Sequence, residues 1–387
     1  MRYRDKHKKT STATTRIVCS LCFITFCFLW LFYFQADVLT VAQHELSEGQ
    51  THYDRTIGCV LITAILQLLQ FGVYAITRLS RRTHALTYLP SFLLLAILSS
   101  LTSHPTSSLS HLHYWLWLAP LVLVAWCVCV WLARQLLPFD NNVKTSTGLF
   151  SRRTWLNLLQ MAAMMLAVAA IGNTNAIYHF KAHAETSLLR GDTEEALQAG
   201  LRSHESDPAL TMLRAYALSC RHELGEKLFT YPVRGTSDNL LPNKSRLLIL
   251  PADTIWKHLG GRPLYSMPAL RFYEALEHDS LATEAVADYV LCSLLIDRDL
   301  VTFHKKLDQF TGTSPVDSLP RHYKEALVLF QQHHSDHPII FPDQKTEDRW
   351  EAMEQMKNEY TDPEARRLKL YENYRDTYWY YYEYGAQ

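Results

Sequence analysis

The chain has 387 residues, and its 38 basic and 38 acidic side chains give a formal net charge of zero at pH 7. A neutral total disfavours a nucleic-acid binder, 48% apolar content disfavours intrinsic disorder, and eight cysteines are too few for a disulfide scaffold of this length. Residues 1–172 hold 14 Lys or Arg against 6 Asp or Glu, whereas residues 173–387 hold 24 against 32. The sequence therefore indicates a basic first part and an acidic second part, and argues against a single soluble globular domain.

Five apolar stretches in the first part lack Asp, Glu, Lys and Arg and have the length that a bilayer requires, about 20 residues. They are residues 17–34, 56–77, 85–103, 112–133 and 154–178. A long basic segment precedes the first stretch and no small-residue cleavage site follows it, so we expect a retained anchor and not a signal peptide. The sequence predicts an all-α protein, with a cytoplasmic arm over 1–16 and a five-span transmembrane domain over 17–178.

Basic residues mark one side of these stretches. Thirteen of the 14 in the first part lie in the N-terminal arm and in the second and fourth loops, and only Arg55 lies in the other loops. Lys and Arg stay on the cytoplasmic side during insertion, so the N-terminus is predicted to be cytoplasmic. An odd number of spans then places residues 179–387 outside, in the periplasm of a bacterial cell. We therefore expect the protein in the inner membrane, in contact with the lipid bilayer.

The second part has the pattern of a helical array, with charged amphipathic segments separated by short breaks. Residues 176–208 contain two such segments, and their spacing resembles that of the tetratricopeptide repeat, a helix hairpin that stacks on its neighbours. The repeat-like positions are Phe180, Ala184, Gly191, Asp192, Ala196, Asp207 and Pro208. Gly225 follows Gly191 by 34 residues, which is the same turn offset in a second unit.

The repeat pattern stops at residues 231–268, where five prolines predict an irregular excursion. Helical patterning resumes at Ala269, with a hairpin broken near Asp297 and two last helices over about 346–359 and 363–384. Arg214, in the second repeat-like segment, is expected to be exposed.

Four phrases of the second part carry a further resemblance: LRAYALS, GEKLF, LPRHYKEAL and DTYWYYYEYG. Through them the chain resembles a family of uncharacterised bacterial multipass membrane proteins with a repeat-like periplasmic tail. This resemblance implies a location and an architecture, but it implies no chemistry.

Two groups of residues were considered as metal or disulfide sites. His333, His334, Asp336 and His337 form a dense cluster that could supply zinc ligands, although we expect solvated surface histidines there and no metal. Cys220 and Cys292 are the only cysteines of the second part, and an oxidising compartment would let them pair if their Cα atoms lie within about 7 Å.

The first loop between apolar stretches carries the carboxylates Asp37, Glu45, Glu48 and Asp54. A carboxylate held in a pocket can act as a general acid or base, so an enzyme acting on lipid-linked sugars or envelope polymer precursors is the alternative function. A transporter component is third, because the stretches lack charged residues. We expect instead a non-catalytic scaffold that binds another envelope protein or peptide, with no cofactor and no nucleic acid.

Overall fold

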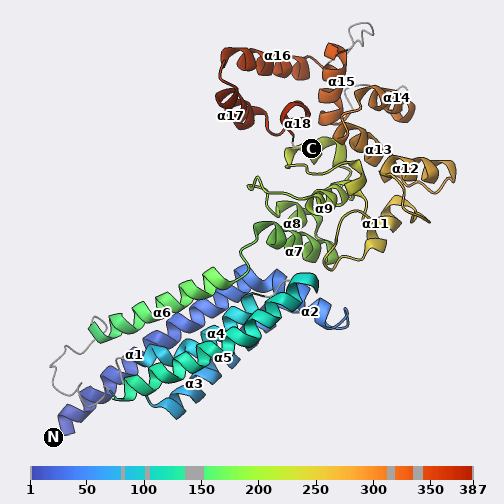
Figure 1. Ribbon diagram of the computed structural model, residues 1–387. Coiled ribbons are helices and arrows are strands. Elements are labelled where there is room, and N and C mark those ends of the chain that lie inside the picture. The colour runs from blue at the N-terminus through green and yellow to red at the C-terminus, as the bar shows by residue number, and fades with distance from the viewer. Residues whose placement is uncertain are drawn as a thin grey trace. The chain divides into compact units, whose positions relative to one another are not determined.

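The computed structural model describes residues 2–79, 83–100, 105–135, 152–311, 319–333 and 343–385. Over these ranges the protein is all-helical and has no strand, as the sequence predicts. The chain forms two compact units, Met1–Asn175 and Ala176–Gln387 (Figure 1). Each unit has its own apolar core.

The first unit is a bundle of long apolar helices. Its elements are α1 (Arg2–Leu29), the π-helix η1 (Trp30–Gln35), α2 (Ala36–Leu46), α3 (Arg55–Thr77), the 3-10 helix η2 (His84–Tyr88), α4 (Leu89–Ser99), α5 (Pro105–Gln135) and α6 (Arg152–Ile171). In the described part of the chain, four helices are long and apolar enough to cross a membrane: Ala13–Leu46, Arg55–Thr77, Tyr114–Gln135 and Thr154–Ile171. They correspond to four of the five expected stretches.

The stretch expected at 85–103 forms a shorter apolar helix, His84–Ser99, and is not clearly a fifth span. Its first turn is a 3-10 helix, and Pro90 begins the α-helix that follows. Phe92 and Leu95 are buried, because α4 packs against α3, α5 and α6. This helix is shorter than the other apolar helices, and its contacts with three of them hold it inside the bundle.

Polar side chains of the bundle form hydrogen bonds both within a helix and between helices. Gln67 Nε2 donates to Gln70 Oε1 at 3.0 Å, and Gln70 Nε2 donates to Thr87 Oγ1 at 2.9 Å. The N–H of Ala85 donates to Asn157 Oδ1 at 2.8 Å, which ties η2 to the beginning of α6. These bonds pair polar atoms that would otherwise be costly in an apolar interior.

The last apolar stretch ends earlier than expected, at Ile171 rather than at residue 178. The N–H of Asn173 donates to the carbonyl of Ser99 at 2.8 Å, and the N–H of Asn175 donates to Asn173 Oδ1 at 3.0 Å. Asparagine side chains compete for backbone groups in this way, which interrupts a helix. A new helix begins only at Ala176.

The second unit is built from short helices around one core. Its elements are α7 (Ala176–Leu189), α8 (Thr193–Gln198), α9 (Pro208–Ser219), α10 (Leu224–Lys227), the 3-10 helices η4 (Leu228–Thr230) and η5 (Ser237–Leu240), α11 (Ala252–Leu259), α12 (Ala269–His278), α13 (Glu284–Ile296), α14 (Leu300–Thr311), α15 (Arg321–His333), α16 (Gln344–Glu359), α17 (Pro363–Tyr374) and α18 (Tyr378–Tyr384).

Three helix pairs of this unit, α7–α8, α9–α10 and α13–α14, are joined by the same turn. Each turn has one residue of positive φ: Gly191 at 79°, His222 at 56° and Arg298 at 61°. The acidic residue that follows, Asp192, Glu223 or Asp299, donates its N–H to the carbonyl five residues earlier. This bond satisfies a carbonyl at the end of the first helix and reverses the chain.

Several repeat-like positions lie where a hairpin needs them. Ala184 and Ala196 are buried where α7 packs against α8. Asp192 caps α8, because its carboxylate accepts the N–H of Glu195 at 2.9 Å. Phe180 lies against Gly200, where a Cβ would come within 2.7 Å of the ring.

Other repeat-like positions have a different role from the expected one. Asp207 and Pro208 begin α9 instead of ending the first hairpin, because the Asp207 carboxylate caps Leu210 N–H at 2.8 Å and Pro208 opens the helix. Gly225 lies inside α10, and the turn falls at His222. Gly225 is needed for packing, since a Cβ there would come within 2.5 Å of Tyr323 Cζ.

The Pro-rich excursion at 231–268 is irregular apart from η5 and α11. Glu185 of α7 fastens it to the core. The Glu185 carboxylate is fully buried and accepts the N–H groups of Leu248, Ile249 and Leu250 at 2.7 to 2.9 Å. One side chain thus supplies the acceptors that a strand or helix would otherwise give this loop.

The single helix expected over 363–384 is two helices, α17 and α18. The hydroxyl of Thr377 accepts the N–H of Tyr380 at 3.2 Å and so caps a new helix. The N–H of Tyr378 donates to Glu325 Oε2 at 2.7 Å instead of to the preceding turn. A partner distant in sequence therefore breaks a helix that local pattern alone would continue.

Replacing Gly225 by Ala tests the packing role of this glycine. A new methyl group would press on the Tyr323 ring, which is buried and donates to Asp288 Oδ1 at 2.8 Å, so it cannot move away freely. We expect G225A to lower the free energy of unfolding by about 1–3 kcal/mol, as overpacking does, despite the better helix propensity of Ala. Thermal unfolding of the full chain measures it.

Gly191→Asn is the matched control. Gly191 has positive φ with open space where a Cβ would stand, and asparagine tolerates that conformation. If G191N lowers the free energy of unfolding as much as G225A does, the effect is a general cost of replacing glycine and does not report packing against Tyr323.

Candidate functional site

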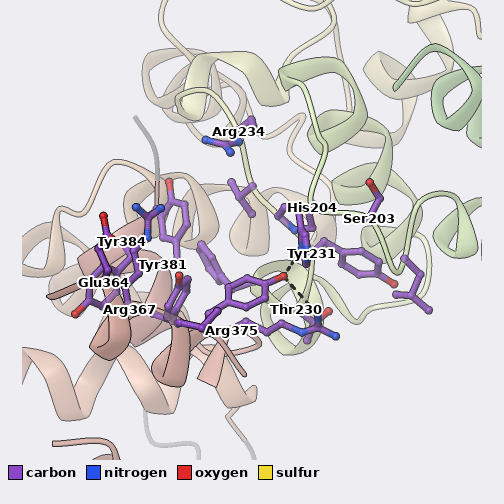
Figure 2. Close-up of a pocket in the computed structure, with 18 residues that line it drawn as sticks. Ser203, His204, Thr230, Tyr231, Arg234, Glu364, Arg367, Arg375, Tyr381 and Tyr384 are labelled. Carbon is purple, nitrogen blue, oxygen red and sulfur yellow. Dashed lines mark hydrogen bonds between the residues drawn. The ribbon is translucent and has the colours of Figure 1, made fainter. Parts of the chain in front are cut away.

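The second unit contains a pocket of about 600 Å³ between two sets of elements. One wall comes from α17, α18 and Arg375 between them, and the other from the loop after α8, from η4 and from the segment that follows η4. Figure 2 shows Arg367, Glu364 and Tyr384 across the pocket from His204 and Tyr231. The volume falls within the range of small-ligand sites.

Six of the 18 residues that line the pocket are phenylalanine or tyrosine. They are Phe229, Tyr231, Tyr371, Tyr380, Tyr381 and Tyr384. Tyr380 stacks on Tyr384 at 5.1 Å between ring centroids and meets the edge of Tyr371 at 5.7 Å. The hydroxyl of Tyr371 is hydrogen-bonded to His204 Nδ1, so α17 is joined to the opposite wall. These contacts give the pocket firm apolar faces with hydroxyl groups at their edges.

The charged side chains of the pocket are mainly cationic. Arg234, Arg367 and Arg375 line it, against a single carboxylate from Glu364. Arg375 lies under the Tyr371 ring, 5.6 Å from its centroid, and donates to the Tyr371 hydroxyl at 3.4 Å. Over the described ranges, none of the three arginines forms an ion pair with a carboxylate. The pocket therefore has spare capacity to bind anions.

Arg214 lies behind this wall, where the sequence predicts an exposed residue. Its side chain is 1% exposed, donates to the carbonyl of Ala199 at 3.0 Å and lies 5.0 Å from the centroid of the Tyr231 ring. Burial lowers the pKa of Arg214 to about 10, which leaves it charged at neutral pH. It offsets the negative end of α8 and adds positive charge next to the pocket.

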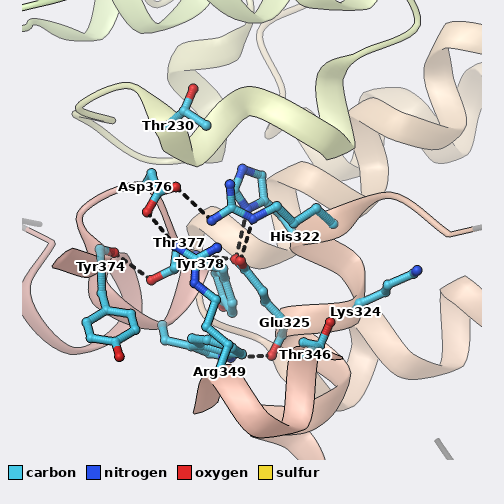
Figure 3. A network of polar contacts seen from close by, with 12 residues as sticks. Thr230, His322, Lys324, Glu325, Thr346, Arg349, Tyr374, Asp376, Thr377 and Tyr378 are labelled. Carbon is cyan, nitrogen blue, oxygen red and sulfur yellow. Dashed lines mark hydrogen bonds and ion pairs between the residues drawn. The ribbon is translucent and has the colours of Figure 1, made fainter. Parts of the chain in front are cut away.

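The position of α18 depends on Glu325, a carboxylate of α15 that is 1% exposed (Figure 3). It accepts Arg321 Nε at 2.8 Å and Tyr378 N–H at 2.7 Å, and His322 Nδ1 lies 2.9 Å away. Its backbone carbonyl accepts Trp379 Nε1–H at 2.6 Å. The beginning of α18 is thus bound to one residue of α15.

Asp376, between α17 and α18, extends this network. It accepts Arg321 at 2.9 Å and Arg349 of α16 at 3.0 Å. Burial alone would raise the pKa of the Asp376 carboxyl, but the two guanidinium groups outweigh burial and hold the pKa below its ordinary value. The network therefore fixes α18, which carries three of the tyrosines of the pocket.

The histidine cluster considered as a metal site is only partly described. His333 ends α15, with Nδ1 at 3.1 Å from the Leu329 carbonyl and its ring against Tyr382. His334, Asp336 and His337 lie outside the described residues. Within the described ranges, no group of three His, Cys, Asp or Glu side chains could hold a metal ion.

The two cysteines considered as a disulfide are free thiols in the structure. Cys292 is fully buried in α13, 3.6 Å from the Tyr323 hydroxyl, and Cys220 ends α9 beside Tyr216. Burial raises the pKa of both thiols, which makes them poor nucleophiles. Cys292 fills space in the core, and Cys220 is half-buried.

The carboxylates considered as catalytic occupy helix ends and surface. Asp54 caps α3 by accepting the N–H of Ile57 at 2.7 Å. Glu45 and Glu48 are exposed near the end of α2, and Asp37 is half-buried in its first turn. Capping accounts for one of the four without any catalytic role.

No local pattern of the sequence indicates this pocket. Its two walls come from residues 201–234 and 364–385, which are far apart in the chain. In the aromatic run TYWYYYEY at the C-terminal wall, Tyr378 and Trp379 are 0% exposed and belong to the core. Only Tyr380, Tyr381 and Tyr384 of this run reach the pocket.

Residues 269–385 match a family of unknown function (DUF6057), which confirms the resemblance to an uncharacterised family for this part of the chain. The matched segment runs from α12 to the end of α18 and includes Glu325. No curated protein and no solved structure matches the chain.

Glu325→Gln should destabilise the second unit. Gln keeps the shape but loses the negative charge that Arg321 requires, and one of its two terminal atoms becomes a donor facing other donors. Removing one partner of a buried charged network costs about 3 kcal/mol, and urea unfolding of the full chain measures the change. Glu359→Gln, on the exposed end of α16, is the control. Equal stability of both variants would contradict the role given to Glu325.

Stability should also depend on pH through Asp376. Because its folded-state pKa is depressed, its contribution is present above the ordinary carboxyl pKa and is lost as pH falls through the folded-state value. We expect D376N to be less stable than the parent near pH 7 and to show a smaller loss on acidification below about pH 4. Melting temperatures between pH 3 and 7 measure this difference, and parallel curves would contradict it.

Proposed function

We propose that this chain is an integral protein of the bacterial inner membrane whose residues 179–387 form a tetratricopeptide-like periplasmic scaffold for another envelope protein. The pocket between residues 201–234 and 364–385 is the observation that carries this proposal. It is concave, aromatic and cationic, and its chemistry is that of a binding site. Arrays of helix hairpins commonly present such concave surfaces to partners.

The five-span topology draws support from bonds inside the first unit. At one end, Thr15 meets Thr154 at 3.3 Å and Ala85 N–H meets Asn157. At the other end, the Ser99 carbonyl accepts the N–H of Asn173. The helix containing η2 and α4 therefore runs beside α6 in the same direction and along most of its length, which favours a fifth crossing.

The orientation draws support from where basic residues gather in this bundle. Arg16 lies 4.5 Å from the centroid of the Tyr74 ring, and Arg134 donates to the Thr77 carbonyl at 2.7 Å. Both contacts lie at the end of α3, next to Arg78. Clustering of arginines at one end favours that end as the cytoplasmic side, and five crossings then place the second unit in the periplasm.

The repeat assignment draws support from the three hairpins that share one turn. Two of them follow each other directly, and α7 packs against both α8 and α9. The embedded-enzyme alternative has less support, because Asp54 serves as a helix cap and Glu45 and Glu48 are exposed. A transporter component stays third.

Site-specific photo-crosslinking in intact cells tests the scaffold. A photoreactive residue replaces Leu368 or Leu201, which are 57% and 53% exposed on opposite rims of the pocket. We expect both positions to crosslink to the same envelope protein, because a partner in the pocket would touch both rims. Mass spectrometry of the crosslinked product identifies it.

Leu281 is the matched control, at 55% exposure and outside the pocket lining. The same crosslinked protein from a photoreactive residue at position 281 would indicate non-specific binding to the surface of the second unit. Absence of any protein product from both rim positions would overturn the scaffold and favour the enzyme alternative.

A further inference from the structure

The pocket is positively charged in a part of the chain that is acidic as a whole. Residues 173–387 hold 24 basic and 32 acidic side chains, yet the pocket has three arginines and one glutamate. A surface of average composition for this half would be negative. The local reversal of sign therefore indicates a site that attracts an anion.

More positive charge lies directly behind the walls. Arg214 lies against Tyr231 on one side, and Arg298 donates to the Gly385 carbonyl at 2.7 Å on the other. Arg298 also lies 5.6 Å from the centroid of the Tyr381 ring. Neither side chain needs to touch a ligand, because charges held at fixed positions in a partly desolvated wall act over several ångströms.

We propose that this pocket binds an acidic segment of an extended peptide, with its carboxylates on Arg234, Arg367 and Arg375 and its apolar groups on the tyrosine walls. This inference rests on the proposed function and names the chemistry of the partner.

The spacing of the arginines favours several separate anionic groups over one compact anion. Arg367 lies on α17 and Arg375 follows the last residue of that helix, eight residues later, which is about 12 Å along a helix. Arg234 projects from the opposite part of the lining, after η4 (Figure 2). Guanidinium groups spread along the lining in this way suit carboxylates at several points of an extended chain better than one compact anion. Guanidinium forks match carboxylate geometry.

The rest of the lining favours a peptide over an acidic sugar chain. Carboxylate and amide side chains, which commonly bind sugar hydroxyl groups, are sparse: besides the hydroxyls of Ser203, Thr230 and the tyrosines, the pocket offers one carboxylate, Glu364, and no Asn, Asp or Gln side chain among the residues that line it. It offers instead tyrosine faces and the apolar side chains of Leu201 and Leu368 at the rims. Those surfaces suit the apolar side chains of a peptide whose acidic residues face the arginines.

Binding to the full chain in nanodiscs of phosphatidylcholine tests this inference. The probe is a fluorescein-labelled octapeptide of alternating glutamate and leucine, and its glutamine counterpart is the charge control. Fluorescence anisotropy should show binding of the glutamate peptide at least about tenfold tighter than that of the glutamine peptide, with weakening as salt is raised. R234Q and R367Q should each weaken binding about tenfold, the effect of losing one charge-assisted contact.

Arg271→Gln is the matched control, because Arg271 is an exposed arginine of α12 outside the pocket. It should leave binding unchanged, and all three variants should keep the parent melting temperature. Equal weakening by R271Q, or equal binding of both peptides, would overturn the inference. Stronger competition by oligogalacturonate or inorganic phosphate than by unlabelled peptide would also overturn it, in favour of an acidic glycan or a compact anion.

Failure of this inference and failure of the scaffold give different results. If no acidic peptide binds while photoreactive residues at 368 and 201 still crosslink to one envelope protein, the scaffold proposal is kept and the acidic-peptide proposal is rejected. If the two rim positions also give no crosslinked protein, both proposals are rejected.

Discussion

The ionic bonds of Glu325 hold together the part of the second unit on which the pocket depends. This carboxylate bonds to a guanidinium and to the first N–H of α18, and an imidazole nitrogen lies beside it, while its own backbone carbonyl accepts the indole of Trp379. A helix that follows the break after α17 could pack in several orientations by apolar contact alone. Directional bonds to one buried carboxylate select a single orientation, in which Tyr380 and Tyr384 line the pocket.

Burying a carboxylate is costly unless every lone pair is used, so such a network contributes more to a unique structure than to overall stability. The same solution appears at Glu185, whose carboxylate takes three N–H groups of the Pro-rich excursion. In both places an acidic side chain replaces missing secondary structure as the partner of backbone donors. The second unit uses buried acids to fix segments that lack regular hydrogen bonding of their own.

The features predicted well from the sequence are those that depend on local composition. Apolar length identifies four membrane-length helices, and the Gly191–Asp192 turn follows from conformational preference and capping. The wrong assignments involve partners distant in the chain. Gly225 packs against Tyr323, and Arg214 binds carbonyls at the end of α8, and neither contact leaves a local pattern. The break between α17 and α18 likewise depends on Glu325, about 50 residues earlier.

The pocket leaves no local pattern either, because its two walls are distant in the chain. The family match covers only one of these walls. Residues 269–385 supply α17 and α18, with Arg367, Arg375 and the tyrosines of one wall. Arg234, His204 and Tyr231 belong to the other wall and lie before the matched segment. Because both walls must face each other to make a concave site, the matched segment alone cannot form it. Binding chemistry proposed for this pocket therefore extends to another protein that matches the family only where that protein also supplies the first wall.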